Sequence, residues 1–142
     1  LIADTLEMMK LSETELKRMP TGYLVQKSTH CIRYHFDLAS PNKDMKFNIV
    51  QSQFSSTNAT DSAFNHLKYL ANEDKVSNGL PGLTYENDYV IKQPLTIYWL
   101  NTGCRYSFEN HKKYATFLLQ SLNDTTIMDS IWCKCGAVNC NN

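Results

Sequence analysis

A regular alternation of apolar and polar residues marks the clearest strand of the chain. Within residues 29–38, polar residues alternate with four apolar ones, which are Ile32, Tyr34, Phe36 and Leu38. Because successive side chains of a strand point to opposite faces, this period of two predicts one buried and one solvated face. Residues 40–44 have the composition of a turn, and residues 45–54 form a second strand-like run, so we expect a hairpin.

Shorter runs predict further strands on both sides of this hairpin. The expected strands are residues 23–27, 84–91, 95–101, 104–108 and 127–133. Residues 114–122 fit either a helix or a well-buried strand. We prefer the strand, because turn-like segments bracket a run of typical strand length.

Two other segments follow a helical pattern. Ser12 and Glu15 have the spacing of a capping box, which predicts a helix within an N-terminal arm of residues 1–20. Apolar residues also recur at helical spacing within residues 58–72, where Asp61 is the expected N-cap.

These elements predict a mainly β fold and a single domain over residues 1–142. Eight strand-like segments favour an eight-stranded antiparallel up-and-down barrel with an N-terminal helix and a short additional helix. A barrel is expected because closure leaves no strand edge exposed. Residues 134–142 would then form a C-terminal tail tethered by a disulfide.

The cysteines change this picture more than any other feature of the composition. The chain carries five of them, which are Cys31, Cys104, Cys133, Cys135 and Cys140. An ordinary cytosolic domain of this size carries fewer, so an oxidising compartment is indicated. Two bridges would leave one thiol that is free or pairs with another chain, and the oligomeric state stays open.

We expect Cys31 and Cys104 each to bridge to the C-terminal cluster of cysteines. Cys133 and Cys135 would share one face of a strand, and such residues rarely pair with each other. A metal half-site is the alternative, with ligands drawn from Cys133, Cys135, Cys140 and one of His30, His35, His66 or His111. Disulfides are favoured over it, because zinc sites usually show two close cysteine pairs.

Two Asn-x-Thr triplets predict N-glycosylation, at Asn58 and at Asn123. Both asparagines lie in polar, loop-like segments, so we expect both to be exposed and at least one to carry sugar. Together with the cysteines they indicate a secreted, extracellular protein. We interpret the start at Leu1, without a signal peptide, as that of a mature chain or a fragment.

The charges and motifs argue against several classes of function. Fourteen basic residues balance fourteen acidic ones, which removes the usual electrostatic reason to expect nucleic acid as a partner. No apolar run is long enough to span a bilayer, so membrane insertion is not expected. We find no phosphate loop, His-Glu-x-x-His or nucleophile elbow, and we expect no enzyme and no cofactor. Asp37, Glu86 and Asp88 are expected to be solvated.

Three stretches carry a resemblance to a known family. They are Gly-Tyr-Leu-Val-Gln-Lys-Ser at residues 22–28 followed by Cys-Ile-Arg-Tyr at 31–34, Thr-Ile-Tyr-Trp-Leu at 96–100 with Cys104, and Ile-Trp-Cys at 131–133 with Cys140. The pattern resembles the lipocalins, in particular the diverged salivary lipocalins of ticks. Most lipocalins have Gly-x-Trp in the first strand. Here Gly22 is followed by Tyr23 and Leu24, so the tryptophan is missing. The resemblance implies a barrel that holds a small ligand.

Aromatic residues on the expected inner faces suggest where that ligand would bind. They are Tyr34, Phe36, Phe47, Trp99 and Tyr106. We expect a secreted protein that sequesters or carries a small apolar or amphipathic ligand in the barrel cavity. The alternative is a secreted interaction or structural protein with a filled core, which binds a macromolecular partner through its loops.

Overall fold

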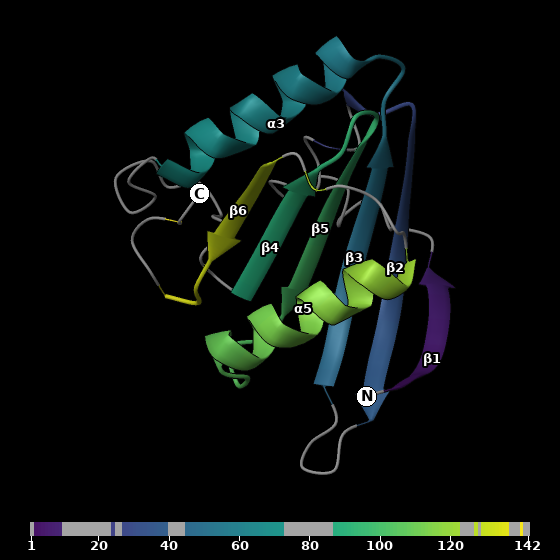
Figure 1. The fold of residues 1–142 in the computed structure, drawn as a ribbon, viewed down its shortest axis with the longest axis vertical. Coiled ribbons are helices and arrows are strands. Elements are labelled where there is room, and N and C mark those ends of the chain that lie inside the picture. The colour runs from purple at the N-terminus through teal and green to yellow at the C-terminus, as the bar shows by residue number, and fades with distance from the viewer. Residues whose placement is uncertain are drawn as a thin grey trace.

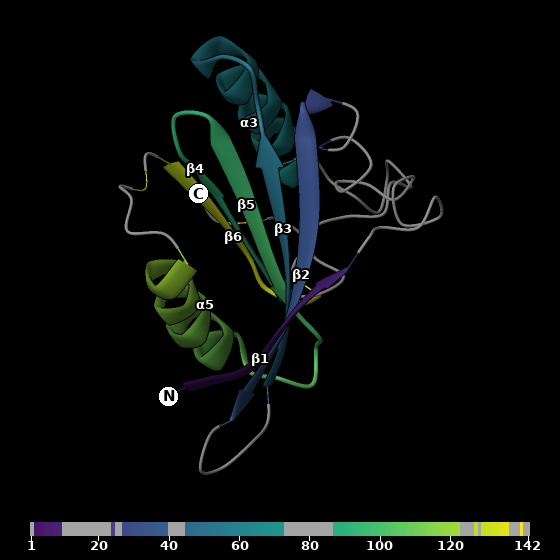
Figure 2. The same cartoon turned by 90° about the vertical axis from the view of Figure 1, so that its right-hand side faces the viewer.

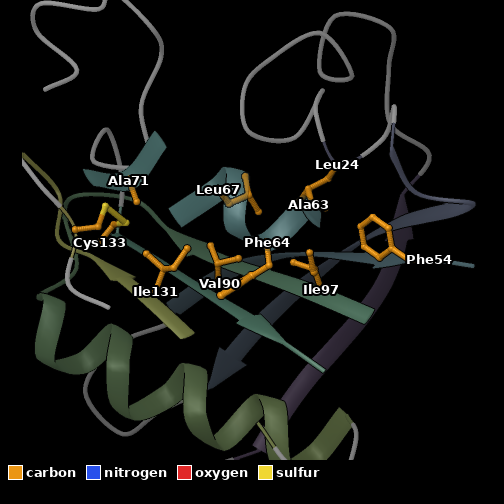
Figure 3. Close-up of a cluster of buried hydrophobic side chains, with 11 residues drawn as sticks. Leu24, Phe54, Ala63, Phe64, Leu67, Ala71, Val90, Ile97, Ile131 and Cys133 are labelled. Carbon is orange, nitrogen blue, oxygen red and sulfur yellow. A yellow bond between two sulfur atoms is a disulfide. The ribbon is translucent and has the colours of Figure 1, made fainter. Parts of the chain in front are cut away.

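The computed structural model describes residues 2–9, 24, 27–39, 45–72, 87–122, 127, 129–136 and 140, with the backbone alone at 2–9, 32–39, 45–47, 70, 72 and 117–122. Within these residues six strands form one antiparallel sheet in the order β1-β2-β3-β5-β4-β6 (Figure 1). The strands are β1 (Ile2–Met9), β2 (His30–Ala39), β3 (Met45–Gln53), β4 (Asn87–Lys92), β5 (Thr96–Thr102) and β6 (Asp129–Cys133). Helices α3 (Thr57–Asn72) and α5 (Phe108–Leu122) cover opposite faces of this sheet (Figures 2 and 3).

The sheet is open, with β1 and β6 as its two edges, so the expected eight-stranded barrel is wrong. Three of the expected strands are replaced by other structure. Residues 114–122 belong to α5, residues 104–107 form the turn that leads into it, and Leu24 and Lys27 are helical. The pattern of apolar residues alone did not decide whether the ends of the sheet would meet.

The N-terminal segment also differs from the expectation. Residues 2–9 form β1, which pairs with β2, where a helical arm was expected. The capping box of Ser12 and Glu15 lies outside the described residues. The hairpin of β2 and β3 is confirmed, with Phe36 opposite Phe47. The strands expected near residues 84–91, 95–101 and 127–133 are confirmed as β4, β5 and β6, with shifted ends.

Helix α3 begins at a serine cap. The Ser56 hydroxyl accepts a hydrogen bond from the Ala59 N–H at 3.1 Å, which satisfies one of the free N–H groups of the first turn. Asp61, the expected cap, instead lies one turn inside the helix. Its carboxylate accepts a hydrogen bond from Lys92 Nζ at 2.8 Å, which ties the helix to β4.

Helix α5 also begins at a serine, because the Ser107 hydroxyl accepts a hydrogen bond from the Asn110 N–H at 3.1 Å. The side chains that follow show why a helix forms here and not a strand. His111 and Ala115 are buried against the sheet four residues apart, whereas Glu109 and Lys113 are exposed. Burial therefore recurs with the helical period.

Each face of the sheet has its own apolar cluster. The α3-side cluster comprises Leu24, Phe54, Ala63, Phe64, Leu67, Ala71, Val90, Ile97, Ile131, Cys133 and Cys140 (Figure 3). The α5-side cluster comprises Ile49, Tyr89, Ile91, Tyr98, Leu100, Tyr106 and Ala115. Alternate residues of β4 and β5 enter the two clusters, so these central strands are buried on both faces. In the described part of the chain, neither helix has the length and apolar character needed to cross a membrane.

Candidate functional site

Two disulfides hold the C-terminal end of the sheet. Cys104 is bonded to Cys135, with the Cα atoms 5.6 Å apart, and Cys133 is bonded to Cys140, with the Cα atoms 4.4 Å apart. The expected bridge from Cys104 to the C-terminal cluster is confirmed. Cys140 is also held by its N–H, which donates to the Ala71 carbonyl of α3 at 3.2 Å.

The expected bridge from Cys31 is wrong, since this residue carries the one free thiol. Cys31 lies at the start of β2, and three strands stand between β2 and β6. Strands are spaced by about 4.8 Å, which puts the two roughly 19 Å apart. A disulfide needs Cα atoms within about 7 Å of each other.

The Cys31 thiol is unsuited to nucleophilic chemistry in this position. Its Sγ atom lies 3.4 Å from the Ser52 hydroxyl. Burial raises the pKa of the thiol, against a smaller lowering by hydrogen bonds to Ser52 and Ser28. A raised pKa keeps the thiol protonated near neutral pH, and the thiolate is the reactive form.

The alternative of a metal half-site is excluded by the disulfides, because the sulfurs of Cys133, Cys135 and Cys140 are all bonded to other sulfurs. Among the described residues, no group of three or more histidine, cysteine or acidic side chains is arranged to hold a metal ion.

The first glycosylation triplet lies in the first turn of α3. Asn58 is exposed there, as expected, although it lies in a helix and not in a loop. Thr60 of the same triplet is fully buried, and its hydroxyl donates to the Ser56 carbonyl at 3.0 Å. Asn123 lies outside the described residues, and the presence of sugar stays a prediction.

The residues expected to line a ligand cavity do not converge. Trp99 packs against the α3-side cluster, whereas Tyr106 belongs to the α5-side cluster on the opposite face. The backbone register places Tyr34 opposite Ile49 and Phe36 opposite Phe47, and their side chains lie outside the description. Trp99 and Tyr106 therefore do not line one common cavity, because the sheet separates the two rings, and a role of these residues in ligand binding stays a prediction.

Two buried polar side chains organise the end of β4 that lies near α5. The Asn87 Nδ2 atom donates to the Tyr106 carbonyl at 2.9 Å, and its Oδ1 atom accepts from the Cys135 N–H at 3.0 Å. Asp88, expected to be solvated, is 1% exposed and accepts a hydrogen bond from Trp99 Nε1 at 2.8 Å. Buried polar groups need such partners, and the bonds of Asn87 also fix the turn before α5 in place.

An aromatic stack lies between α5 and the edge strand β6. The rings of Tyr89 and Trp132 stack with centroids 3.4 Å apart and an interplanar angle of 12°. Phe108 and His111 of α5 meet the edge of Trp132 at centroid distances of 6.2 and 6.3 Å. Trp132 and Phe108 are only half-buried, so part of this stack faces solvent.

His111 is the buried polar member of the stack. Its Nδ1 atom lies 2.9 Å from the Thr102 hydroxyl of β5. Burial lowers the pKa of the imidazole to about 4, against a smaller raising by a hydrogen bond to the Asp88 backbone. The ring is therefore neutral at physiological pH and packs as part of the core.

Three cations lie over rings on this side of the molecule. The Lys112 Nζ atom is 5.1 Å from the Trp132 centroid and 5.7 Å from the Phe108 centroid. Arg105 lies 4.7 Å from the Tyr106 ring, and Lys113 lies 5.4 Å from the Tyr114 ring. Within the described residues none of the three has a carboxylate partner.

We call this set the aromatic–cation surface. It consists of Arg105, Tyr106, Phe108, Lys112, Lys113, Tyr114 and Trp132. Lys112 was missed by the sequence analysis, although it follows Phe108 by four residues, the spacing at which side chains meet on a helix. Placing Phe108 in an expected strand at residues 104–108 concealed this signal.

No protein-family model, no curated protein and no solved structure matches the chain. The comparisons therefore leave the resemblance to lipocalins as a hypothesis, while the barrel that it implied is absent from the described residues.

Proposed function

We propose that this chain is a secreted, non-enzymatic binding protein that recognises a macromolecular partner through the aromatic–cation surface. The observation that carries the proposal is the set of three cations held over aromatic rings without a carboxylate partner in the described chain. Aromatic residues and arginine dominate the energetics of protein interfaces, whereas an isolated surface lysine contributes little.

The rigidity of this region supports the proposal. The Cys104–Cys135 disulfide and the hydrogen bonds of Asn87 tie the turn that carries Arg105 to the end of β6. Binding by a surface that is already ordered loses less conformational entropy, so more of the contact energy appears as affinity. The two disulfides also favour an extracellular location, where such bonds form and persist.

The way the core is filled favours recognition at the surface over an enclosed small ligand. Helices cover both faces of β4 and β5, and packed side chains form a cluster on each face. The groups best suited to catalysis are also separated, since Cys31 contacts Ser52 on the α3 side and His111 contacts Thr102 on the α5 side.

The proposal is tested by placing a photo-crosslinking residue, p-benzoylphenylalanine, beside the aromatic–cation surface. Glu109 is exposed next to Phe108, and Asn65 is an exposed control position on α3. Each variant is irradiated in the extracellular fluid of its source. We expect the residue at position 109 to crosslink to a defined macromolecule that the residue at position 65 does not capture. No crosslink at 109, with a small molecule retained in native mass spectrometry, would overturn the proposal.

A further inference from the structure

The charges of the chain balance as a whole but not around the aromatic–cation surface. Residues 104–116 and 131–136 contain four basic side chains, which are Arg105, Lys112, Lys113 and Lys134. Glu109 is the only acidic residue in these two segments, and His111 is neutral because burial lowers its pKa to about 4. This end of the molecule is therefore locally basic.

The disulfide explains how residues far apart in the sequence contribute to one basic region. Arg105 follows Cys104, and Lys134 precedes Cys135, so the bridge between those cysteines brings both cations to one place. Lys112 joins them through Trp132, which lies two residues before Lys134. Helix α5 begins beside the ends of β4 and β6, where these segments meet (Figure 1).

The rings orient these cations without neutralising them. The negative face of a ring attracts an ammonium or guanidinium group, but the ring has no net charge. On the opposite face of the sheet the situation differs, because Lys68 and Lys92 also approach the Phe64 ring yet each has a carboxylate partner. Among the described residues, the cations on the α5 side thus have no carboxylate counter-charge of the kind that Asp61 and Asp129 supply on the α3 side.

We infer, resting on the proposed function, that the partner of the aromatic–cation surface is an acidic polypeptide segment that also carries aromatic or large apolar side chains. Carboxylates supply the counter-charge that the described residues lack, and apolar side chains cover the exposed parts of the half-buried rings of Phe108 and Trp132. A sulfated polysaccharide offers the charge without the apolar groups. A nucleic acid would gain little from this surface, because its affinity scales with the number of phosphates that cations neutralise and only four cations lie in these segments.

The test uses synthetic polymers as probes with the full chain. They are a random copolymer of glutamate and tyrosine, poly-L-glutamate, heparin and a single-stranded oligonucleotide. Binding of each labelled polymer is measured by fluorescence anisotropy at one ionic strength. We expect the copolymer to bind most tightly, because it combines carboxylates with rings.

Variants then show whether the copolymer binds at the aromatic–cation surface. Lys112→Gln should weaken copolymer binding roughly three- to fivefold, and the double variant Arg105→Gln/Lys112→Gln roughly tenfold or more. Lys112→Arg should bind the copolymer about as well as the unchanged chain, since it keeps the positive charge. Lys68→Gln is the matched control on the α3 side and should leave the affinity within about twofold. Circular dichroism establishes that each variant is folded.

Three results would overturn the inference. These are tighter binding of heparin or the oligonucleotide than of the copolymer, equal losses for Lys112→Gln and Lys68→Gln, and no copolymer binding by the folded chain. The crosslinking experiment separates this inference from the proposed function. A macromolecule captured at position 109 without copolymer binding would leave the function standing and reject only the acidic polypeptide.

Discussion

The two faces of the sheet share the same strands but are covered in different ways. On the α3 side Phe64 and Leu67 are fully buried, and the nearby cations Lys68 and Lys92 form ion pairs with carboxylates of the chain. On the α5 side aromatic rings stack beside the aliphatic core, Trp132 is only partly buried, and within the described residues Arg105, Lys112 and Lys113 lie over rings without a carboxylate partner.

This difference indicates that the two faces contribute differently to folding stability and to binding. Stability comes mainly from apolar area removed from water, and on the α3 side the large side chains of Phe64 and Leu67 are removed from it completely. The α5 side keeps aromatic area and charge at the surface, which adds less to folding but is the kind of surface that partners bind. The comparison therefore predicts that mutations on the two sides affect different measurements.

The largest expected effect is the loss of stability from Phe64→Ala on the α3 side. Phe64 is 0% exposed, so its removal leaves a cavity and should lower the free energy of unfolding by about 3–5 kcal/mol. The half-buried Phe108 is the matched ring on the α5 side, and Phe108→Ala should cost about 1 kcal/mol. Urea denaturation measures both. Equal losses would contradict the division between the two faces.

The disulfides give the next largest effect, and one lies on each side. The Cys104–Cys135 bridge has a sequence separation of 31 and the Cys133–Cys140 bridge one of 7. In the chain-entropy model, replacing the first pair by alanine costs about 3–4 kcal/mol and replacing the second about 2–3 kcal/mol.

Hydrogen exchange then separates the two bridges by location. Loss of Cys104–Cys135 should lower protection at the start of α5, whereas loss of Cys133–Cys140 should spare it and loosen the contact of Cys140 with Ala71. Loss of protection in α5 from both double variants would show that the bridges do not act on separate faces.

The buried histidine makes the α5 side sensitive to acid. The pKa of His111 is lowered to about 4 in the folded chain, from about 6.5 when unfolded, so the unfolded chain binds more protons between these values. The stability that His111 contributes is complete above pH 6.5 and is lost as the pH falls towards 4, by about 3 kcal/mol. Unfolding free energies measured across this range should show that slope.

Two variants show whether His111 causes this pH dependence of the unfolding free energy. His111→Asn keeps a hydrogen-bonding group near Thr102 and removes the titration, so the slope should become flatter. His30→Asn changes an exposed histidine and should leave the slope as it is. A slope that persists in His111→Asn would show that another group is responsible.

The smallest effect is expected from the cations themselves. Lys68 Nζ lies 2.7 Å from Asp129, and both side chains are about one-third exposed, so their coupling should be below about 1 kcal/mol. Burial raises the pKa of Asp129, but the hydrogen bonds from Lys68 and the Ser130 backbone and the charges of Lys68 and Lys92 together lower it more, so the pKa is lowered overall. The coupling is therefore present at neutral pH and lost as the pH falls below the ordinary range of an aspartate. A double-mutant cycle on Lys68 and Asp129 measures it, and Lys112→Gln should change stability even less.

The local elements were predictable where one period was clear. Residues 29–38 alternate strictly and form β2, and the helical spacing in residues 58–72 corresponds to α3. The apolar residues of segment 114–122 fit both a helix and a buried strand. The Ser107 cap, which favours a helix, was overlooked. The helix forms because burial of His111 and Ala115 against the sheet recurs with the helical period, whereas the strand was preferred only because turn-like segments bracket a run of typical strand length.

The order of the strands in the sheet could not be predicted from local sequence patterns. Each strand shows which residues are buried, but not which strand lies beside it. Placing β5 between β3 and β4 keeps Cys31 far from β6, which contradicts the expected bridge. Local patterns also did not show that both faces of the sheet would be covered, which leaves Trp99 and Tyr106 on opposite sides of it. The candidate site was missed for the same reason, since Lys112 and Trp132 meet only when α5 lies across the end of β6.

The connectivity of the two disulfides also determines how the chain would respond to mechanical force. If tension is applied between Leu24 and Cys140, the covalent path runs along the chain to Cys104, crosses to Cys135, returns to Cys133 and crosses to Cys140. The chain between Cys104 and Cys135, which contains α5, is bypassed, so roughly 100 Å of contour length stays hidden. A pulled molecule would extend β2 to β5 first, while Phe108, Lys112 and Trp132 would remain on a covalently closed loop that bears no load.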